Sequence, residues 1–461
     1  MPQHEVVVIG AGIAGLSAAY ELTRRGVDVI VLERAPRAGG VILSEEIDGY
    51  TVDAGPDALL VQKREAIKLC EELGLGPALV PTTPPRIAYI QRGGRLHPLP
   101  ASSVLGIPTH VGPFVRTRLF SIGGKLRMAR ELLVAPREDD GDESIGAFIA
   151  RRFGSEATAY LAEPLLAGIH AGDVNRLSIR SLFPQLVDAE REHGSLLRSF
   201  RLRPRRPAST DGAFRSLPGG LSQLVRAVTG ALPAGAVRLG TGADRVTSTN
   251  GSPFDIHTQG GTTLSSRAVI LATPAFVTGT LLRDFDSGLS RLCGEVPYSS
   301  TATVALGFRR EDVAHPLNGS GFVVPRLEST GVLAASWLSS KWPNRAPAGK
   351  ILMRTFVGGA RDPRALERSD DELVRLSLAA LTPLIGLRGA PGLTRVYRWE
   401  RANAQHEIGH AARLEAIERA LARRPGIFVT GSGFRGVGIP DCVADGRATG
   451  KQAAEWLGKR P

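Results

Sequence analysis

The stretch that decides the fold lies near the N-terminus, where residues 5–16 read EVVVIGAGIAGL. An apolar strand is followed by a turn with three glycines and then by a helix-like run. Gly10 allows a tight turn, Gly12 removes a side chain where a pyrophosphate must approach the backbone, and Gly15 lets the helix lie close to the strand. The helix N-terminus offers free N–H groups and a partial positive charge to phosphates. This order of elements predicts a nucleotide-binding unit.

An acidic residue ends the second strand of this unit. Residues 29–32 read VIVL, and Glu33 follows them, about 20 positions after the glycine turn. A carboxylate at this place can bind the hydroxyls of an adenosine ribose and repel a 2′-phosphate. A glycine-rich turn alone is a weak signal, but strand, helix, strand and acid together indicate dinucleotide binding.

The chain carries a surplus of positive charge. It has 461 residues, a formal net charge of +12 and a pI of about 10.1. Such a surplus favours an anionic partner, which can be nucleic acid, acidic lipid or a polycarboxylate substrate. Aromatic residues make up only 5%, and no block of Lys and Arg is interleaved with them, so we expect no nucleic-acid partner. The length allows two or three domains.

The three cysteines, Cys70, Cys293 and Cys442, show no CxxC spacing. Neither a disulfide framework nor a metal site is therefore indicated. No apolar run reaches the ~18 residues that a membrane-spanning helix needs. The first strand begins close to the N-terminus, which leaves no room for a signal peptide. We expect a cytoplasmic protein, and attachment to the inner face of the cell membrane stays open.

Strand-like and helix-like segments alternate through the rest of the chain. Residues 268–272 form a continuous apolar run, as in a buried parallel strand. The segments 183–200 and 441–457 read as helices, and the latter follows a strand at 426–431 and a glycine-rich loop. The chain thus leaves the nucleotide-binding unit and returns to it at its end. A flavoprotein needs such a return because FAD is a long molecule.

We therefore predict an α/β protein with a discontinuous Rossmann-like FAD-binding domain, a mixed-sheet substrate domain and a helical cap or membrane-facing domain. The polar break Arg201–Gly212 is the best candidate for a linker. The predicted segments are 1–80, 213–298 and 396–461 for the FAD-binding domain, 81–212 for the helical cap, and 299–395 for the strands of the substrate-binding domain.

Further motifs occur along almost the whole chain. The more general ones are the glycine turn, Glu33, Gly39-Gly40 and Asp53–Pro56. The narrower ones are AGIHAGD at 167–173, LSIRS at 177–181, FP at 183–184, the segment 190–195, Gln405, Gly409-His410 and GVGIPDC at 436–442. Together they resemble the flavin-dependent protoporphyrinogen and coproporphyrinogen oxidases, within the amine-oxidase and phytoene-desaturase superfamily. KWP at 341–343 and APAGK at 346–350 are similar to the bacterial, coproporphyrinogen-using branch.

The resemblance implies oxidation of a porphyrinogen to a porphyrin in heme biosynthesis, with FAD as cofactor and O₂ as the acceptor that yields H₂O₂. A hydride would pass from a ring carbon to flavin N5, so no catalytic side chain and no metal are assigned. The family further implies that Arg86 pairs with a propionate, that Leu333 and Phe356 line the macrocycle pocket and that Gly168 faces the macrocycle. The choice between coproporphyrinogen III and protoporphyrinogen IX stays open, although residues 341–343 favour the former.

The residues that we assign to the cofactor come from the turns and from the resemblance. The turn Gly438–Asp441 opens the last helix, and its free N–H groups could face the negative charge of a reduced flavin. The alternative is a glycine turn that only starts this helix. By resemblance, the backbone of Val246 meets the adenine and Trp399 meets the flavin. The assigned residues are Gly10, Ala11, Gly12, Ile13, Ala14, Gly15, Glu33, Arg34, Gly39, Gly40, Gly55, Pro56, Asp57, Ala58, Val246, Trp399, Val437, Gly438 and Ile439.

Two positions depart from the family pattern. Residues 404–406 read AQH where the family usually has Pro-Gln-Tyr, and Leu59 replaces the usual aromatic residue after the Gly-Pro pair. The histidines His170, His193, His406 and His410 are interpreted as hydrogen-bonded structural groups and not as bases. We interpret Cys442 as a small residue that packs in a helix, and not as a site of covalent attachment to the flavin.

Other functions stay open at this point. An amine oxidase would need an aromatic cage, and the chain has only six Tyr; a carotenoid desaturase would need an apolar tunnel without Arg86. A flavin- or porphyrin-binding protein without turnover is a third hypothesis. Residues 104–133 favour a cap over the substrate, with a membrane contact as the alternative. The cluster Arg198–Arg206 favours a solvated loop over a contact with acidic lipid, and a homodimer stays open.

Overall fold

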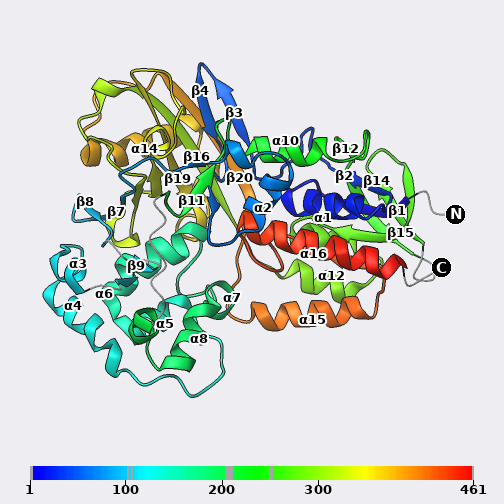
Figure 1. Cartoon of the computed structure of the whole chain (residues 1–461), viewed down its shortest axis with the longest axis horizontal. Helices are drawn as coiled ribbons and strands as arrows, with labels where there is room; N and C mark the ends of the chain where they lie inside the picture. The colour runs from blue at the N-terminus through cyan, green and yellow to red at the C-terminus, as the bar shows by residue number, and fades with distance from the viewer. Residues whose placement is uncertain are drawn as a thin grey trace.

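The computed structural model describes residues 4–100, 103–104, 107–108, 111–202, 211–248 and 253–458. Figure 1 shows three groups of elements. A first sheet lies on the right, a second sheet lies at the upper left, and a group of helices lies at the lower left. Both ends of the chain lie beside the first sheet. The structure thus has the α/β class that the sequence predicts.

The first sheet is mainly parallel and carries the N-terminal strand. Its order is β12 (Val237–Arg238), β2 (Val29–Leu32), β1 (His4–Ile9), β15 (Thr263–Leu271), β14 (Phe254–Thr258) and β13 (Ala243–Thr247). A further strand, β21 (Ile427–Val429), runs parallel to β15. β14 pairs in the antiparallel sense with both β13 and β15, and the other strand pairs of this sheet are parallel. The predicted apolar run at 268–272 is therefore confirmed as a buried parallel strand.

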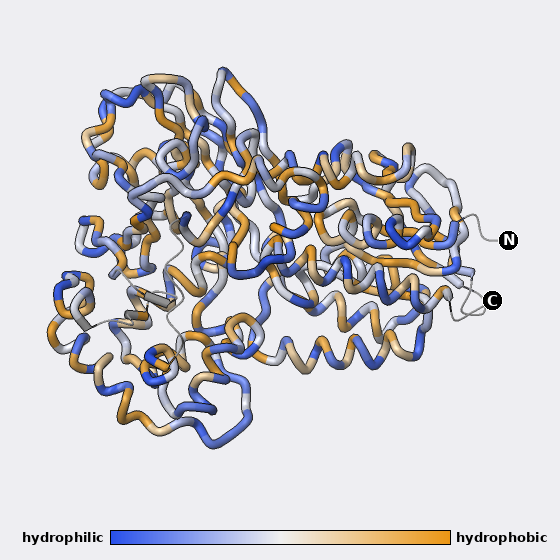
Figure 2. Tube along the Cα trace, in the orientation of Figure 1, coloured by the Kyte–Doolittle hydropathy of each residue, from blue (hydrophilic) through white to orange (hydrophobic). Residues whose placement is uncertain are grey.

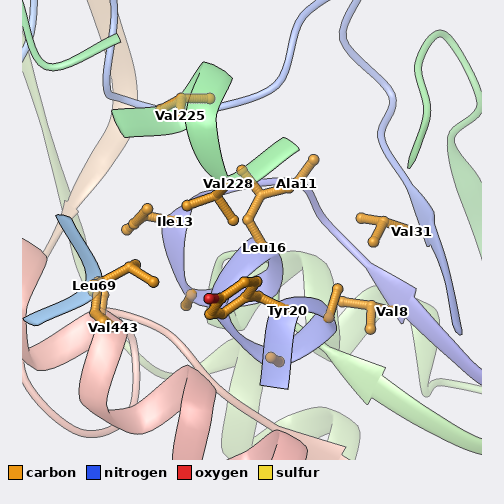
Figure 3. Packing of buried hydrophobic residues seen from close by; sticks show 14 of the residues in the cluster. Val8, Ala11, Ile13, Leu16, Tyr20, Val31, Leu69, Val225, Val228 and Val443 are labelled. Atoms are coloured by element: carbon orange, nitrogen blue, oxygen red, sulfur yellow. The ribbon is translucent and has the colours of Figure 1, made fainter. Parts of the chain in front are cut away.

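Both faces of this sheet are covered. Val6 and Val8 of β1 belong to a core with α1 (Ile13–Arg24) and α16 (Ile439–Gly458), whereas Val7 and Ile9 belong to a second core with α11 (Ala275–Leu281), α12 (Ser287–Gly294) and α15 (His410–Ala422). Figure 3 shows the first core, in which Tyr20 lies among residues of several elements. Figure 2 shows the matching hydrophobic stretches along these strands. Burial on both faces explains why the strands are apolar at every position.

The end of the chain returns to its beginning. α16 packs along α1 so closely that a Cβ atom on Gly446 would lie 2.2 Å from the carbonyl oxygen of Ala14, and one on Gly450 would lie 2.6 Å from that of Ala18. Glycine is thus required at both positions for the two backbones to meet. The predicted return of the chain to the nucleotide-binding unit is confirmed by this contact and by the pairing of β21 with β15.

The second sheet is mainly antiparallel. Its order is β20 (Leu393–Ala404), β16 (Tyr298–Arg309), β19 (Lys350–Gly358), β18 (Val332–Ser336), β17 (Gly321–Val323), β7 (Ala88–Arg92) and β8 (Arg95–Pro98). The predicted hairpin in the region 87–97 corresponds to β7 and β8, with Gly93 and Gly94 in its turn. α14 (Asp370–Ile385), which begins with a Ser369–Glu372 capping box, supplies Leu373 and Leu381 to the core on one face.

Two small sheets join the large ones. The first is the hairpin of β3 (Ser44–Ile47) and β4 (Tyr50–Asp53). In the second, β11 (Phe214–Ser216) pairs with β5 (Leu59–Leu60) on one side and with β6 (Val80–Pro81) on the other. β5 follows the loop 55–58 and β6 leads toward Arg86, so this sheet brings a segment assigned to the cofactor close to one assigned to the substrate.

The helical group begins with α3 (Val111–Arg116), α4 (Ile122–Ala129) and α5 (Ile145–Phe153), and the predicted cap Ser144 accepts a hydrogen bond from the N–H of Ala147. The single helix expected over 183–200 is wrong. α8 (Pro184–His193) ends at Gly194, whose φ of 67° is left-handed, and α9 (Leu196–Leu202) starts anew. The Glu131 carboxylate accepts the N–H groups of Leu196 and Leu197, which satisfies the start of α9.

The remaining elements are shorter. They are α2 (Glu65–Glu72), α6 (Ser155–Ala157), the π-helix η3 (Thr158–Ala167), η4 (Gly168–His170), α7 (Ile179–Leu182), α10 (Ser222–Gly230), α13 (Leu338–Lys341), β9 (Ser103–Val104), β10 (Ile107–Pro108) and the 3₁₀ turns η1 (Gly76–Ala78), η2 (Arg130–Leu133), η5 (Arg310–Asp312), η6 (Arg326–Glu328), η7 (Gly359–Arg361) and η8 (Ala365–Glu367). Within the described ranges, every helix is too short or too polar to cross a membrane.

The five-segment division of the chain stays a prediction. Segment 81–212, expected to be mainly helical, also contributes β7 and β8 to the second sheet, and β20 runs across the expected boundary at 396. Most of the expected linker Arg201–Gly212 lies outside the described residues, as does part of the arginine cluster that ends at Arg206.

Candidate functional site

The glycine turn after β1 has room on one side only. A Cβ atom on Gly15 would lie 2.0 Å from the carbonyl oxygen of Gly10, and one on Gly10, whose φ is 106°, would lie 2.8 Å from that of Ala272. By contrast, apart from the adjoining residues of the turn itself, no heavy atom of the described residues lies within 4 Å of a Cβ placed on Gly12. No described side chain caps α1, and its first turn has no acid. The turn therefore offers open space and free N–H groups, which fits a pyrophosphate.

Glu33 stands at the end of β2 beside this turn. Its two carboxylate oxygens accept the N–H groups of Ala11 and Ala35, each at 2.8 Å. These hydrogen bonds fix the half-buried carboxylate next to the glycine turn, where its remaining lone pairs can accept hydroxyl groups. The neighbouring Arg34 is exposed, with its side chain at the surface.

The pair Gly39-Gly40 closes the other side of the same space. The N–H of Gly39 binds the carbonyl oxygen of Ala11 at 2.8 Å, and a Cβ on Gly40 would lie 3.4 Å from the Cα of Gly12. Both glycines have left-handed φ values, 106° and 58°. The structure thus brings together three segments that the sequence assigns to the cofactor.

Trp399 and the loop 55–58 form a second part of the site. The indole Nε1 of Trp399, on β20, donates to the carbonyl oxygen of Ala54 at 3.2 Å. A Cβ on Gly55 would lie 1.9 Å from the carbonyl oxygen of Val41, and the Trp399 ring would be 3.7 Å from it. The close contacts explain a glycine at position 55, and they place two predicted cofactor residues against each other.

The carboxylate of Asp57 is fully engaged by other side chains. Lys341 Nζ and Trp342 Nε1 each donate to Oδ2 at 2.7 Å, and Arg354 Nη2 donates to Oδ1 at 2.8 Å. Burial alone would raise the pKa of Asp57, but Lys341 and Arg354 hold it well below its ordinary value. The carboxylate is therefore ionised, and any contact with a cofactor falls to the backbone of this loop, together with Pro56 and Ala58.

The loop between β21 and α16 contains Val437 and Gly438, and Ile439 begins the helix. The N–H of Cys442 binds the carbonyl oxygen of Gly438 at 2.9 Å, so the first turn of α16 starts there. Lys63 Nζ lies 2.7 Å from the Asp441 carboxylate, which neutralises the acid in this turn. The positive end of the helix is then left for a negative group.

Two histidines bind backbone carbonyl groups in the segment between β21 and α16. The rings of His406 and His410 stack at 3.8 Å, and their Nε2 atoms bind the carbonyl oxygens of Ser432 and Phe434 at 2.9 and 3.0 Å. Burial, with the neighbouring ring in the case of His406, lowers the pKa of His406 to about 3 and also lowers that of His410. Burial likewise lowers the pKa of His170 to about 4. These contacts agree with the expected structural role.

The residues assigned to the substrate lie on several elements. Leu333 is buried on β18, and Phe356 lies on the adjacent strand β19, where it pairs with Ala334. Arg86 is exposed, and its Nε binds the carbonyl oxygen and hydroxyl of Thr82 at 2.9 and 3.0 Å. Gly168 begins η4, directly after the π-helix η3.

One assigned residue lies apart from these groups. Val246 is completely buried on β13, at the edge of the first sheet, where it pairs with Ile256. Its side chain packs in the second core of this sheet, so a contact with a nucleotide would involve its backbone. This agrees with the backbone role that the resemblance implies, and that role stays a prediction.

Sequence reasoning missed the charged side chains that connect these segments. Arg361 binds the carboxylate of Glu163, on η3, through Nε and Nη2, both at 2.8 Å, and its Nη1 binds the carbonyl oxygen of Val324 at 2.6 Å. Arg345 and Asp53 form a completely buried pair at 3.0 Å. No local pattern reveals these pairs, because the partners are far apart in the sequence. The sequence identifies residues 341–343 as a family signature, but it does not show that Lys341 and Trp342 bind Asp57.

Comparisons with known proteins agree with this geometry. The family model described as flavin containing amine oxidoreductase matches residues 13–454. Coproporphyrinogen III oxidase of Bacillus subtilis (strain 168) is 36% identical, with 98% of each chain covered. Coproporphyrinogen III oxidase of Staphylococcus aureus (strain NCTC 8325 / PS 47) is 34% identical, with 98% of this chain and 99% of the relative covered.

The chain belongs to the porphyrinogen-oxidase branch of the flavin-containing amine oxidoreductases. Among solved structures, a proposed protoporphyrinogen oxidase from Exiguobacterium sp. 255-15 superposes with a TM-score of 0.87 at 32% identity and covers 99% of each chain. A cyclohexylamine oxidase of Brevibacterium oxydans, at 18% identity and a TM-score of 0.72, shares the fold. The predicted family and the predicted flavin cofactor, FAD, are thus confirmed for this flavoprotein.

Proposed function

We propose that this flavoprotein oxidises a porphyrinogen, with coproporphyrinogen III preferred over protoporphyrinogen IX, to the corresponding porphyrin in heme biosynthesis. The observation that carries the proposal is the full-length similarity to three coproporphyrinogen III oxidases at 33–36% identity. The site supports it, because the open side of the glycine turn, the Gly55–Trp399 contact and the apolar pair Leu333 and Phe356 suit a flavin and a flat macrocycle.

FAD held at this site would supply the two-electron chemistry as a hydride acceptor, with O₂ as the final acceptor that would yield H₂O₂. The chain supplies binding and position. The N–H groups at the start of α1 would bind the pyrophosphate, and the Glu33 carboxylate would accept ribose hydroxyls. The N–H groups at the start of α16 would stabilise the negative charge of a reduced flavin.

On the substrate side, Leu333 and Phe356 pack against the apolar ring system and exclude water from it. The Arg86 guanidinium, oriented by Thr82 through its Nε, pairs with a propionate through its terminal nitrogens. Gly168 lets the macrocycle approach the backbone. These contacts hold the reacting carbon in place, and bring no nucleophile of the chain into the reaction.

Anaerobic reduction tests this proposal. The flavin of the purified protein should bleach when coproporphyrinogen III is added without O₂, and admission of air should produce H₂O₂ and porphyrin fluorescence. Turnover of protoporphyrinogen IX, measured in the same way, should be slower. A flavin that neither porphyrinogen reduces would overturn the proposal. In that case, bleaching by a primary amine would indicate an amine oxidase. Binding of a porphyrin without any bleaching would indicate a carrier protein.

We also propose a cytoplasmic protein that contacts anionic lipid through α3 and α4. Ile122 and Leu126, one turn apart on α4, are 79% and 63% exposed, and the exposed Arg116 and Arg130 flank them. Exposed apolar residues beside cations suit an anionic interface. Ile122→Ser with Leu126→Ser should reduce sedimentation with phosphatidylglycerol vesicles; equal binding of the double variant would contradict the contact. The open prediction of a homodimer is testable by sedimentation velocity.

A further inference from the structure

The loop 55–58 rests on a buried group of charges, which we call the Asp57 cluster: Asp57, Lys341 and Arg354. The Asp57 carboxylate receives Lys341 Nζ at 2.7 Å and Arg354 Nη2 at 2.8 Å. The side chains of Asp57, Lys341 and Arg354 are 10%, 13% and 1% exposed. Trp342 Nε1 adds a neutral hydrogen bond to the same carboxylate at 2.7 Å.

The cluster carries an excess of positive charge. One carboxylate lies between two cations, and the coulombic effect of both cations holds the pKa of Asp57 below its ordinary value although burial opposes it. The neighbouring pair of Asp53 and Arg345 is balanced, so it does not cancel the excess. Water screens such a buried charge weakly, and its field therefore acts on groups several ångströms away.

This charge lies directly behind the segment assigned to the flavin. Arg354 donates to the backbone carbonyl oxygens of Asp53 and Gly55, and Trp399 binds that of Ala54, the residue between them. The Arg354 guanidinium also lies 4.7 Å from the centre of the Phe356 ring, on the substrate side. A group placed against Gly55 and Trp399 would thus have the cluster on the far side of one backbone segment.

We propose that the Asp57 cluster positions the loop 55–58 and stabilises the negative charge that the flavin gains on reduction, so that Lys341 sets the reduction potential and not the choice between porphyrinogens. This rests on the proposed contact of Gly55 and Trp399 with the flavin. Lys341 is a positioning residue, because its ammonium group binds Asp57. The signature at 341–343 then has a physical reason: its first two residues are the partners of Asp57.

The midpoint potential of the bound flavin tests the proposal without any substrate. In the holoprotein, Lys341→Met removes one cation, so the preference for reduced over oxidised FAD should fall about tenfold, which is about 30 mV for a two-electron couple. Asp57→Asn removes the anion and should shift the potential in the opposite direction. Lys341→Arg keeps the charge and should stay near the wild type. Trp342→Phe is the matched control, since it removes a hydrogen bond to Asp57 but no charge.

Opposite shifts for Lys341→Met and Asp57→Asn support the electrostatic role, which a purely structural tie would not produce. Equal potentials in these variants, the wild type and Trp342→Phe would overturn it. An altered ratio of coproporphyrinogen to protoporphyrinogen turnover in Lys341→Met, at an unchanged potential, would overturn it too and would make Lys341 a selectivity residue. Loss of the proposed activity is a separate result, because the potential is measured with dyes.

Discussion

The contact between α1 and α16 depends mainly on close backbone packing, whereas the contacts around the second sheet and the helical group depend more on buried ion pairs. In the first, Gly446 and Gly450 let two backbones meet, apolar side chains fill most of the remaining space, and a single ion pair, Arg447–Glu21 at 3.2 Å, joins the two described helices. In the second, buried ion pairs such as Arg152–Glu131 and Arg361–Glu163 connect distant segments. Close backbone packing suits a fixed cradle for a dinucleotide. Ion pairs tolerate irregular loops, because a long side chain can reach several carbonyl oxygens at once.

Among the variants that test this comparison, the largest loss of stability is expected at the buried ion pair of Arg152 and Glu131 in the helical group. Arg152 is completely buried and binds Glu131, Glu190 and the carbonyl oxygens of Val134 and Gly194. Arg152→Met should lower the free energy of unfolding by about 3–5 kcal/mol, because it leaves Glu131 buried without its cation. Urea unfolding followed by circular dichroism measures this loss.

The matched control for this variant is an exposed pair. Arg364 and Glu367 form an ion pair at the surface, 83% and 61% exposed. Arg364→Met should leave the urea midpoint unchanged, because water screens the pair and solvates either partner alone. Equal losses in both variants would show that burial does not decide what these pairs contribute.

A smaller loss is expected at the backbone contact. Gly446→Ala puts a Cβ atom 2.2 Å from the carbonyl oxygen of Ala14, so α16 must move away from α1. We expect a loss of about 1–3 kcal/mol, as for other overpacked contacts, with weaker retention of flavin during gel filtration. Gly230→Ala, on α10, is the control, since no described heavy atom outside its own helix and its chain neighbours lies within 4 Å of the added Cβ. A Gly446→Ala protein as stable as this control would contradict the contact.

The same comparison explains which features the sequence predicts: those set by local patterns, and not contacts between residues far apart in the chain. The glycine turn, Glu33 and the apolar strand at 268–272 were predicted because their patterns are local. β20 was missed, since its sequence LTRVYRWERANA has no apolar run and it lies at the edge of the second sheet. The break at Gly194 was missed because helical periodicity continues on both sides of it. The partners of Asp57 were missed because their positions, 341, 342 and 354, follow only from the fold.

The pair between η3 and the second sheet should affect the substrate more than the fold. Arg361 and Glu163 hold the segment that leads into Gly168 against the sheet that carries Leu333. Glu163→Gln keeps one hydrogen-bond acceptor but loses the negative charge. The free energy of unfolding should therefore fall by about 1–2 kcal/mol. KM for the porphyrinogen should rise severalfold, with kcat and the flavin spectrum unchanged. An unchanged KM would limit this pair to a structural role, and partial rescue by Glu163→Asp would support the positioning one.

The smallest effect concerns pH and the histidines under the cofactor loop. The pKa of His406 is lowered to about 3 and that of His170 to about 4, by burial first, whereas an unfolded histidine has a pKa near 6.5. Below about pH 6.5 the unfolded chain binds protons that the folded protein refuses, so stability falls as the pH drops. When the pH falls from 7 to 5.5, each such histidine should lower the free energy of unfolding by roughly 1 kcal/mol. His406→Tyr, the family residue, removes one of these groups, and its thermal midpoint should fall less steeply over this range. Parallel pH profiles for the variant and the wild type would mean that His406 takes up protons as readily in the folded protein as in the unfolded chain, in conflict with its burial and its stacking on His410.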